Sequence, residues 1–130
     1  MSSRTTLVTG ATAAGREAAI RARLDAAGHA GPTAIILEGL ASGNDPFESL
    51  AGRAGIEVVR IAPGCLCCSG NLTLRVTLNR LLRTAPAHLY ISLADSRHLA
   101  QIEAFLTAPA YASWLSLAPT LHGDAHPAQA

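Results

Sequence analysis

The chain has 130 residues, 49% of them apolar, and ten basic against nine acidic residues give a formal charge of +1. This length suits one compact domain, and no apolar run approaches the roughly 18 residues that a membrane span requires. The balanced charge gives no electrostatic reason to expect nucleic acid or a membrane surface as a partner. We find no secretory signal at the start of the chain and therefore expect a cytoplasmic protein.

Short apolar runs and helical periodicities alternate along the chain. Four apolar runs that end at loop-forming residues predict strands, over 5–9, 33–37, 57–61 and 88–93. Apolar residues spaced three and four apart predict helices over 14–27, 71–83 and 97–107. Two shorter helices are also expected, one through Phe47 and Leu50 and one that holds Tyr111, Trp114 and Leu115.

This order of elements predicts the fold class. Strands that alternate with helices indicate right-handed crossovers and a mainly parallel sheet with helices on both faces, a three-layer α/β domain. We place this domain at residues 1–118 and expect a flexible polar tail over 119–130, with His122 and His126 in solvent or donating metal ligands. The uninterrupted apolar run at 33–37 is typical of a strand buried on both faces. Ligands of such sheets bind beyond the carboxyl ends of the strands.

A glycine-rich segment follows the first predicted strand. Residues 10–17 read Gly-Ala-Thr-Ala-Ala-Gly-Arg-Glu, and two glycines separated by four residues before a helix are typical of a phosphate-binding loop. Gly10, Gly15 and Arg16 are therefore candidate nucleotide-binding residues, because backbone N–H groups and a cation would face an anion there. Such a loop ends in Lys and Ser or Thr, whereas this chain has Arg16 and Glu17. The alternative is an ordinary turn between a strand and a helix.

A cluster of thiols follows the third predicted strand. Cys65, Cys67 and Cys68 are the three cysteines of the chain, and an odd, tightly spaced set is not a disulfide framework. Thiolates are soft ligands, so we expect zinc or another transition-metal ion here. Cys68 opens a predicted helix, whose N-terminus favours the thiolate form. The alternatives are three small buried residues in a turn, or a redox-sensing site.

Together these segments resemble the CobW/HypB/UreG family of P-loop GTPases, the metallochaperone and metal-insertase group, over roughly residues 5–107. The likeness is most specific at 64–72, Gly-Cys-Leu-Cys-Cys-Ser-Gly-Asn-Leu, which is similar to the Gly-Cys-x-Cys-Cys motif of the CobW-like branch. The resemblance implies a P-loop sheet that binds GTP and Mg²⁺ and couples hydrolysis to the handling of zinc, cobalt or nickel. It also implies an acidic residue at the metal site, and Glu38 occupies that position.

The chain departs from the family pattern where GTP hydrolysis is concerned. All ten basic residues are arginine, so the phosphate-loop lysine and the guanine-reading Asn-Lys-x-Asp motif are both missing. We therefore expect a truncated CobW-like protein that binds a metal ion through Cys65, Cys67, Cys68 and Glu38 and has an eroded nucleotide site. One alternative is a GTP-binding metallochaperone that uses Arg16 in place of lysine. The other is a non-catalytic interaction scaffold. Expected partners are the metal ion and either a metal-receiving protein or a second copy of the chain.

Overall fold

The elements of the fold follow one another as the sequence predicts, with two additional strands near the end. The structure, a computed structural model, describes residues 3–27, 32–39, 55–61, 72–94 and 99–123. The strands in these ranges are β1 Ser3–Thr9, β2 Thr33–Glu38, β3 Ile56–Ile61, β4 His88–Ser92, β5 Leu115–Leu117 and β6 Leu121–His122. The helices are α1 Ala13–Ala27, α2 Leu72–Leu82, α3 Leu99–Leu106 and α4 Pro109–Ala112.

The strands form one parallel sheet. Their order is β3-β2-β4-β1-β5, and β6 pairs with β1 beyond β5. β4 lies between β1 and β2, so Ser92 at its end is level with both Val8 and Leu37. The α/β architecture with a mainly parallel sheet is therefore confirmed, and it is consistent with a truncated P-loop-type fold.

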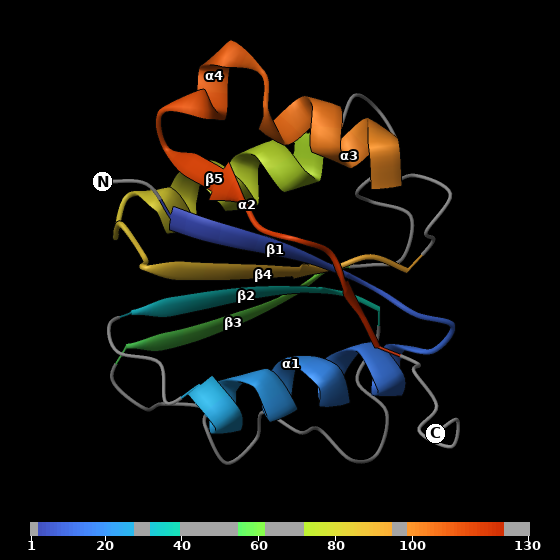
Figure 1. The fold of residues 1–130 in the computed structure, drawn as a ribbon. Helices are drawn as coiled ribbons and strands as arrows, with labels where there is room; N and C mark the ends of the chain where they lie inside the picture. The colour runs from blue at the N-terminus through green and yellow to red at the C-terminus, as the bar shows by residue number, and fades with distance from the viewer. Residues whose placement is uncertain (1–2, 28–31, 40–54, 62–71, 95–98, 124–130) are drawn as a thin grey trace.

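Helices cover both faces of the sheet. α1 lies against one face, and α2, α3 and α4 lie against the other (Figure 1). Side chains of a strand alternate between the faces, so Ala34 and Ile36 join the core under α2 and α3 while Ile35 and Leu37 join the core under α1. All four are at most 2% exposed. The predictions of three layers and of a central strand buried on both faces are confirmed.

α2 shows why its sequence forms an amphipathic helix. Leu74, Leu78 and Leu81 recur at spacings of four and three and are at most 1% exposed. Burying each leucine stabilises the fold by roughly 1.5–3 kcal/mol. Thr77 is also buried, whereas the other residues between these leucines are exposed, Val76 at 61%. No helix in the described parts of the chain is long and apolar enough to cross a membrane.

Two predictions about the last third of the chain need correction. The expected helix through Tyr111 and Leu115 ends at Ala112, and Leu115 instead begins β5 beside Ser3. Leu115 and Leu117 flank an exposed serine, a period of two that suits a strand. The expected tail over 119–130 contains β6, because Leu121 pairs with Val8. The helix expected through Phe47 and Leu50 lies outside the described residues.

Candidate functional site

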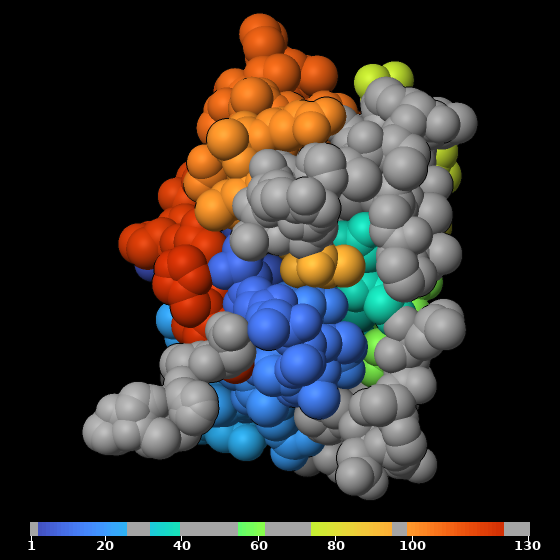
Figure 2. Space-filling model, turned by 90° about the vertical axis from the view of Figure 1, so that its right-hand side faces the viewer, coloured from blue at the N-terminus to red at the C-terminus, as the bar shows by residue number. Residues whose placement is uncertain are grey.

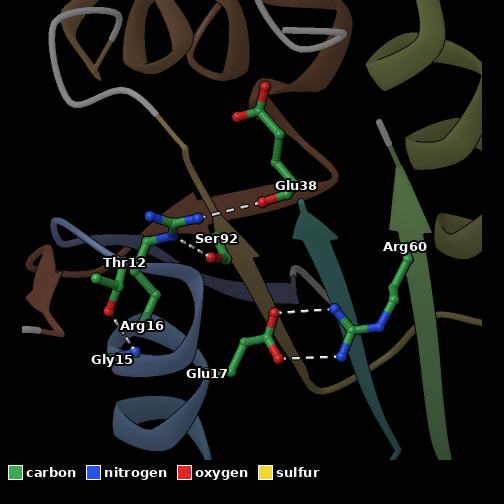
Figure 3. Close-up of polar contacts among 7 residues, drawn as sticks. All are labelled: Thr12, Gly15, Arg16, Glu17, Glu38, Arg60 and Ser92. Carbon is green, nitrogen blue, oxygen red and sulfur yellow. Dashed lines mark hydrogen bonds and ion pairs between the residues drawn. The ribbon is translucent and has the colours of Figure 1, made fainter. Parts of the chain in front are cut away.

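The carboxyl ends of the strands form the face of the molecule where the candidate residues gather. Figure 2 views this face directly: the chain after β1 (blue), the end of β2 (cyan) and the chain after β4 (orange) lie side by side there. β1 ends at Thr9 and α1 already begins at Ala13, so Gly15 lies inside the helix. Thr12 Oγ1 accepts a hydrogen bond from Gly15 N at 3.0 Å (Figure 3).

Thr12 is the N-cap of α1. A capping hydroxyl occupies one of the N–H groups that a helix start would otherwise offer to an anion. The segment from Gly10 therefore has the local structure of a short strand-to-helix turn, the alternative that the sequence left open. A role for Gly10 and Gly15 in nucleotide binding stays a prediction.

The Arg16 side chain forms hydrogen bonds to residues at the ends of three strands. Its side chain is almost fully buried, since the residue is 3% exposed. Nε donates to Ser92 Oγ at 2.8 Å, one terminal nitrogen donates to the Gly10 carbonyl at 2.8 Å, and the other donates to the Glu38 carbonyl at 3.2 Å (Figure 3). The planar guanidinium suits this role, because its donors reach several acceptors in fixed directions. The residue at the position of the phosphate-loop lysine thus contacts oxygen atoms of the protein itself.

Glu38 ends β2 and is only 4% exposed. Its carbonyl accepts from Arg16, while its carboxylate points away from that guanidinium (Figure 3). Oε1 accepts a hydrogen bond from Ala94 N at 2.7 Å, which holds the carboxylate beside the chain that leaves β4. A carboxylate with its orientation fixed in this way is a suitable oxygen ligand for a metal ion.

Glu17 forms an ion pair that the sequence analysis missed. Arg60 of β3 donates to both of its carboxylate oxygens, at 2.9 and 3.0 Å (Figure 3). The Glu17 side chain is 4% exposed and that of Arg60 22%. Arg60 follows Ile56 and Val58 at spacings of two and therefore lies on the same strand face, which packs under α1. A lone charge on this apolar face was the signal for a partner on the helix. Glu17 therefore faces β3, where Arg60 balances its charge.

The short strand β6 covers the start of α1. His122 pairs with Thr9 in the sheet, and Nδ1 of its ring lies 2.9 Å from Thr9 Oγ1. Gly123 then passes so close that a Cβ there would lie 2.5 Å from Arg16 Cα. His122, which we expected in a tail, is therefore held beside the candidate site.

The three cysteines lie outside the described residues. In the parts of the chain that the structure describes, no three His, Cys, Asp or Glu side chains gather as a metal site. The described residues that flank them along the chain are Ile61 and Leu72. Ile61 is level with Glu38 in the sheet, and Gly39 N donates to its carbonyl at 2.9 Å. Cys65 follows Ile61 by four residues in the sequence. Of the predicted site residues, the structure brings together Gly10, Arg16 and Glu38.

Comparison with known proteins adds a partial likeness. No family model matches the chain, and no solved structure matches it significantly. The chain is similar to the zinc chaperone YeiR of Escherichia coli (strain K12), with 39% identity over 74 residues, which is 56% of this chain and 23% of that protein. The chain thus spans about a quarter of the length of this curated relative.

Proposed function

We propose that this protein handles zinc or a similar transition-metal ion and belongs to the CobW-like group of metallochaperones. The ion is its cargo, held by the Cys67 and Cys68 thiolates together with Cys65 or the Glu38 carboxylate. The likeness to a zinc chaperone supports the choice of metal. The donor set also supports it, because thiolates with one carboxylate suit tetrahedral zinc.

One structural observation carries this proposal. Glu38 is a buried carboxylate at a strand end, and its register partner Ile61 precedes Cys65 by only four residues. Four residues of extended chain reach at most about 14 Å. This chain length allows Cys65 to approach Glu38, and that supports the proposed ligand set.

The contacts of Arg16 disfavour a bound nucleotide phosphate. Arg16 uses its guanidinium on Ser92, Gly10 and Glu38, so a bound phosphate would compete with those three acceptors. If GTP with Mg²⁺ binds, it would release the Glu38 carbonyl from Arg16 and so affect the proposed metal ligand directly. GTP is therefore a second ligand worth including in the same measurement.

A competitive zinc titration tests the proposal. Reduced protein would be titrated against a chromophoric chelator, first alone and then with GTP and Mg²⁺. We expect one zinc ion per chain and loss of this stoichiometric binding in the Cys67→Ser, Cys68→Ser protein. Unchanged affinity in that double variant would exclude the thiolate site.

The Glu38→Gln variant tests the carboxylate ligand independently of the thiol ligands. The amide oxygen can still accept from Ala94 N, so the local hydrogen bond survives while the anionic ligand is lost. If Glu38 is a ligand, we expect zinc affinity to fall at least about tenfold, the lower limit known for residues that merely support a metal site. Glu57→Gln is the matched control, because this half-exposed glutamate forms a surface pair with Arg80 and lies on β3 rather than at the candidate site. Equal affinities of the two glutamine variants would leave Cys65 as the third ligand.

A further inference from the structure

A second surface, away from the candidate site, combines exposed apolar side chains with arginines. Among the described residues, the large apolar side chains that stand exposed are Val76, at 61%, and Trp114, at 52%. Val76 is on α2 and Trp114 follows α4, so both lie on the layer opposite α1 (Figure 1). Exposed aromatic residues at a concave site commonly mark contact surfaces.

A hollow of about 250 Å³ lies beside Trp114. It is lined by Asn79, Leu82, Arg83, Ala110, Tyr111 and Trp114. The Tyr111 hydroxyl donates to Asn79 Oδ1 at 3.0 Å. This bond between two lining residues holds α4 against α2. Val76 lies three and seven residues before Asn79 and Arg83, so it continues the same helical stripe. We call Val76, Trp114 and the residues lining the hollow the α2–Trp114 surface.

The charged side chains of α2 and of the turn after it, which border this surface, are all arginine. Arg75 and Arg80 lie on α2 and Arg83 follows it, while residues 72–87 and 109–117 contain no acidic residue. Arg80 pairs with Glu57 at 3.3 Å, but both side chains are about half exposed, so the pair is weak and exchangeable. Arg75 lies over the Phe105 ring, 6.0 Å from its centroid. Arg83, at the rim of the hollow, is exposed and makes no ion pair with a described residue.

We propose that the α2–Trp114 surface docks a segment of a partner protein that carries an apolar or aromatic anchor flanked by acidic side chains. The anchor would fill the hollow against Trp114 and Tyr111, and the acidic flanks would pair with Arg83, Arg80 and Arg75. Arginine and tryptophan are the residues that most often dominate the energy of such contacts. A second copy of the chain is the poorer occupant, because a symmetric contact would place these arginines against one another.

The chain contains a single tryptophan, so fluorescence tests the proposal at the residue concerned. The probe is a synthetic peptide of about a dozen residues, with Glu and Asp around two adjacent Phe or Leu anchors. We expect saturable change in Trp114 emission, weaker binding at high salt, and no saturation with a matched peptide of Lys in place of the acids. Absence of saturable binding by the acidic peptide would overturn the proposal.

Charge reversal locates the contact. Arg83→Glu should weaken binding at least about tenfold, the effect of losing one close charge pair. Arg23→Glu is the matched control, because this exposed arginine lies on α1 at the opposite layer, and it should leave the affinity unchanged. Equal losses in both variants would show attraction by net charge alone and contradict a defined surface.

Trp114→Phe and Trp114→Ala test the anchor site, with peptide fluorescence anisotropy as the readout. Phe should retain part of the affinity and Ala should lose most of it, while circular dichroism confirms that both variants fold. Retention of full affinity in Trp114→Ala would contradict an anchor in the hollow. Self-association of the wild-type chain that blocks the peptide would instead identify a second copy as the occupant and overturn the acidic partner.

Discussion

The guanidinium of Arg16 joins segments that are far apart in the sequence. Gly10, Glu38 and Ser92 come from three different strand ends, and each supplies one oxygen to it. A buried cation is stable only when its donors are satisfied, so the side chain and its acceptors depend on one another. The same contacts fix the backbone at Glu38, the carboxylate proposed as a metal ligand.

Removing this guanidinium should cost substantial stability. Arg16→Met leaves the Gly10 and Glu38 carbonyls without this donor, and we expect the free energy of unfolding to fall by about 3 kcal/mol. Arg16→Lys should lose less, because one ammonium can still reach some of the acceptors. Urea denaturation measures both, with the exposed Arg23→Met as control. A loss for Arg16→Met within about 0.5 kcal/mol of the control would show that the network is not structural.

At the scale of elements, Tyr111 links α4 to α2, and its phenol should make the stability of the fold decrease at alkaline pH. Burial raises the pKa of Tyr111 above its ordinary value, and the Arg75 guanidinium partly offsets this effect. The unfolded chain therefore ionises the phenol at lower pH than the folded chain does. The contribution of the neutral Tyr111 phenol to stability is complete below about pH 10 and is lost as the pH rises through the pKa of the folded state.

Tyr111→Phe should separate these two effects. At pH 8 the variant loses the bond to Asn79, and we expect the free energy of unfolding to fall by about 1 kcal/mol. Between about pH 9 and 11 its stability should decline less steeply than that of the wild type, because the variant lacks one phenol with a raised pKa. Urea denaturation across this range measures both quantities. The remaining slope should include Tyr90, whose pKa burial also raises. Parallel pH profiles would contradict the assignment.

The close packing of Gly123, directly after β6, should also make the fold sensitive to substitution. Any Cβ at this position meets the backbone of Gly15 and Arg16, so Gly123→Ala must displace β6 from β1 or shift α1. We expect a loss of about 2 kcal/mol, typical of overpacking. His122→Ala removes only the contact with Thr9 and should cost less than Gly123→Ala. Hydrogen exchange at Gly123 N, which donates to the Thr9 carbonyl, reports the displacement. Wild-type stability and exchange in Gly123→Ala would exclude tight packing there.

The elements differ in how well the sequence predicted them, for physical reasons. α2 was predicted because burial of Leu74 and Leu78 leaves a helical apolar period, and β2 because burial on both faces leaves the uninterrupted apolar run at 33–37. β5 and β6 were missed because elements of three and two residues are too short for their pattern to outweigh the helical spacing of their neighbours, and their pairing with β1 is non-local. The partners of Arg16 could not be predicted either, since they depend on strand order and register.

At the scale of the whole molecule, metal binding should couple to folding. An ion that binds only the folded chain stabilises it by mass action, by about 2.7 kcal/mol at a free concentration 100 times the dissociation constant. This expectation depends on the proposed function. Zinc should therefore raise the melting temperature of the reduced wild-type protein, and a chelator should reverse the shift. The Cys67→Ser, Cys68→Ser protein should show neither change. An equal zinc-induced rise in that variant would place the ion elsewhere on the chain.

The position of β1 in the sheet sets the order in which the molecule can assemble. β1 pairs with β4, β5 and β6, and its first partner residue, His88, follows Arg4 by 84 positions. In β2 and β3, by contrast, paired residues such as Thr33 and Ile56 are 23 positions apart, so these strands can pair early. During synthesis β1 therefore remains unpaired until β4, β5 and β6 have left the ribosome. β1 is made before its partners and pairs late, and during that interval its apolar residues are open to chaperones or to other chains.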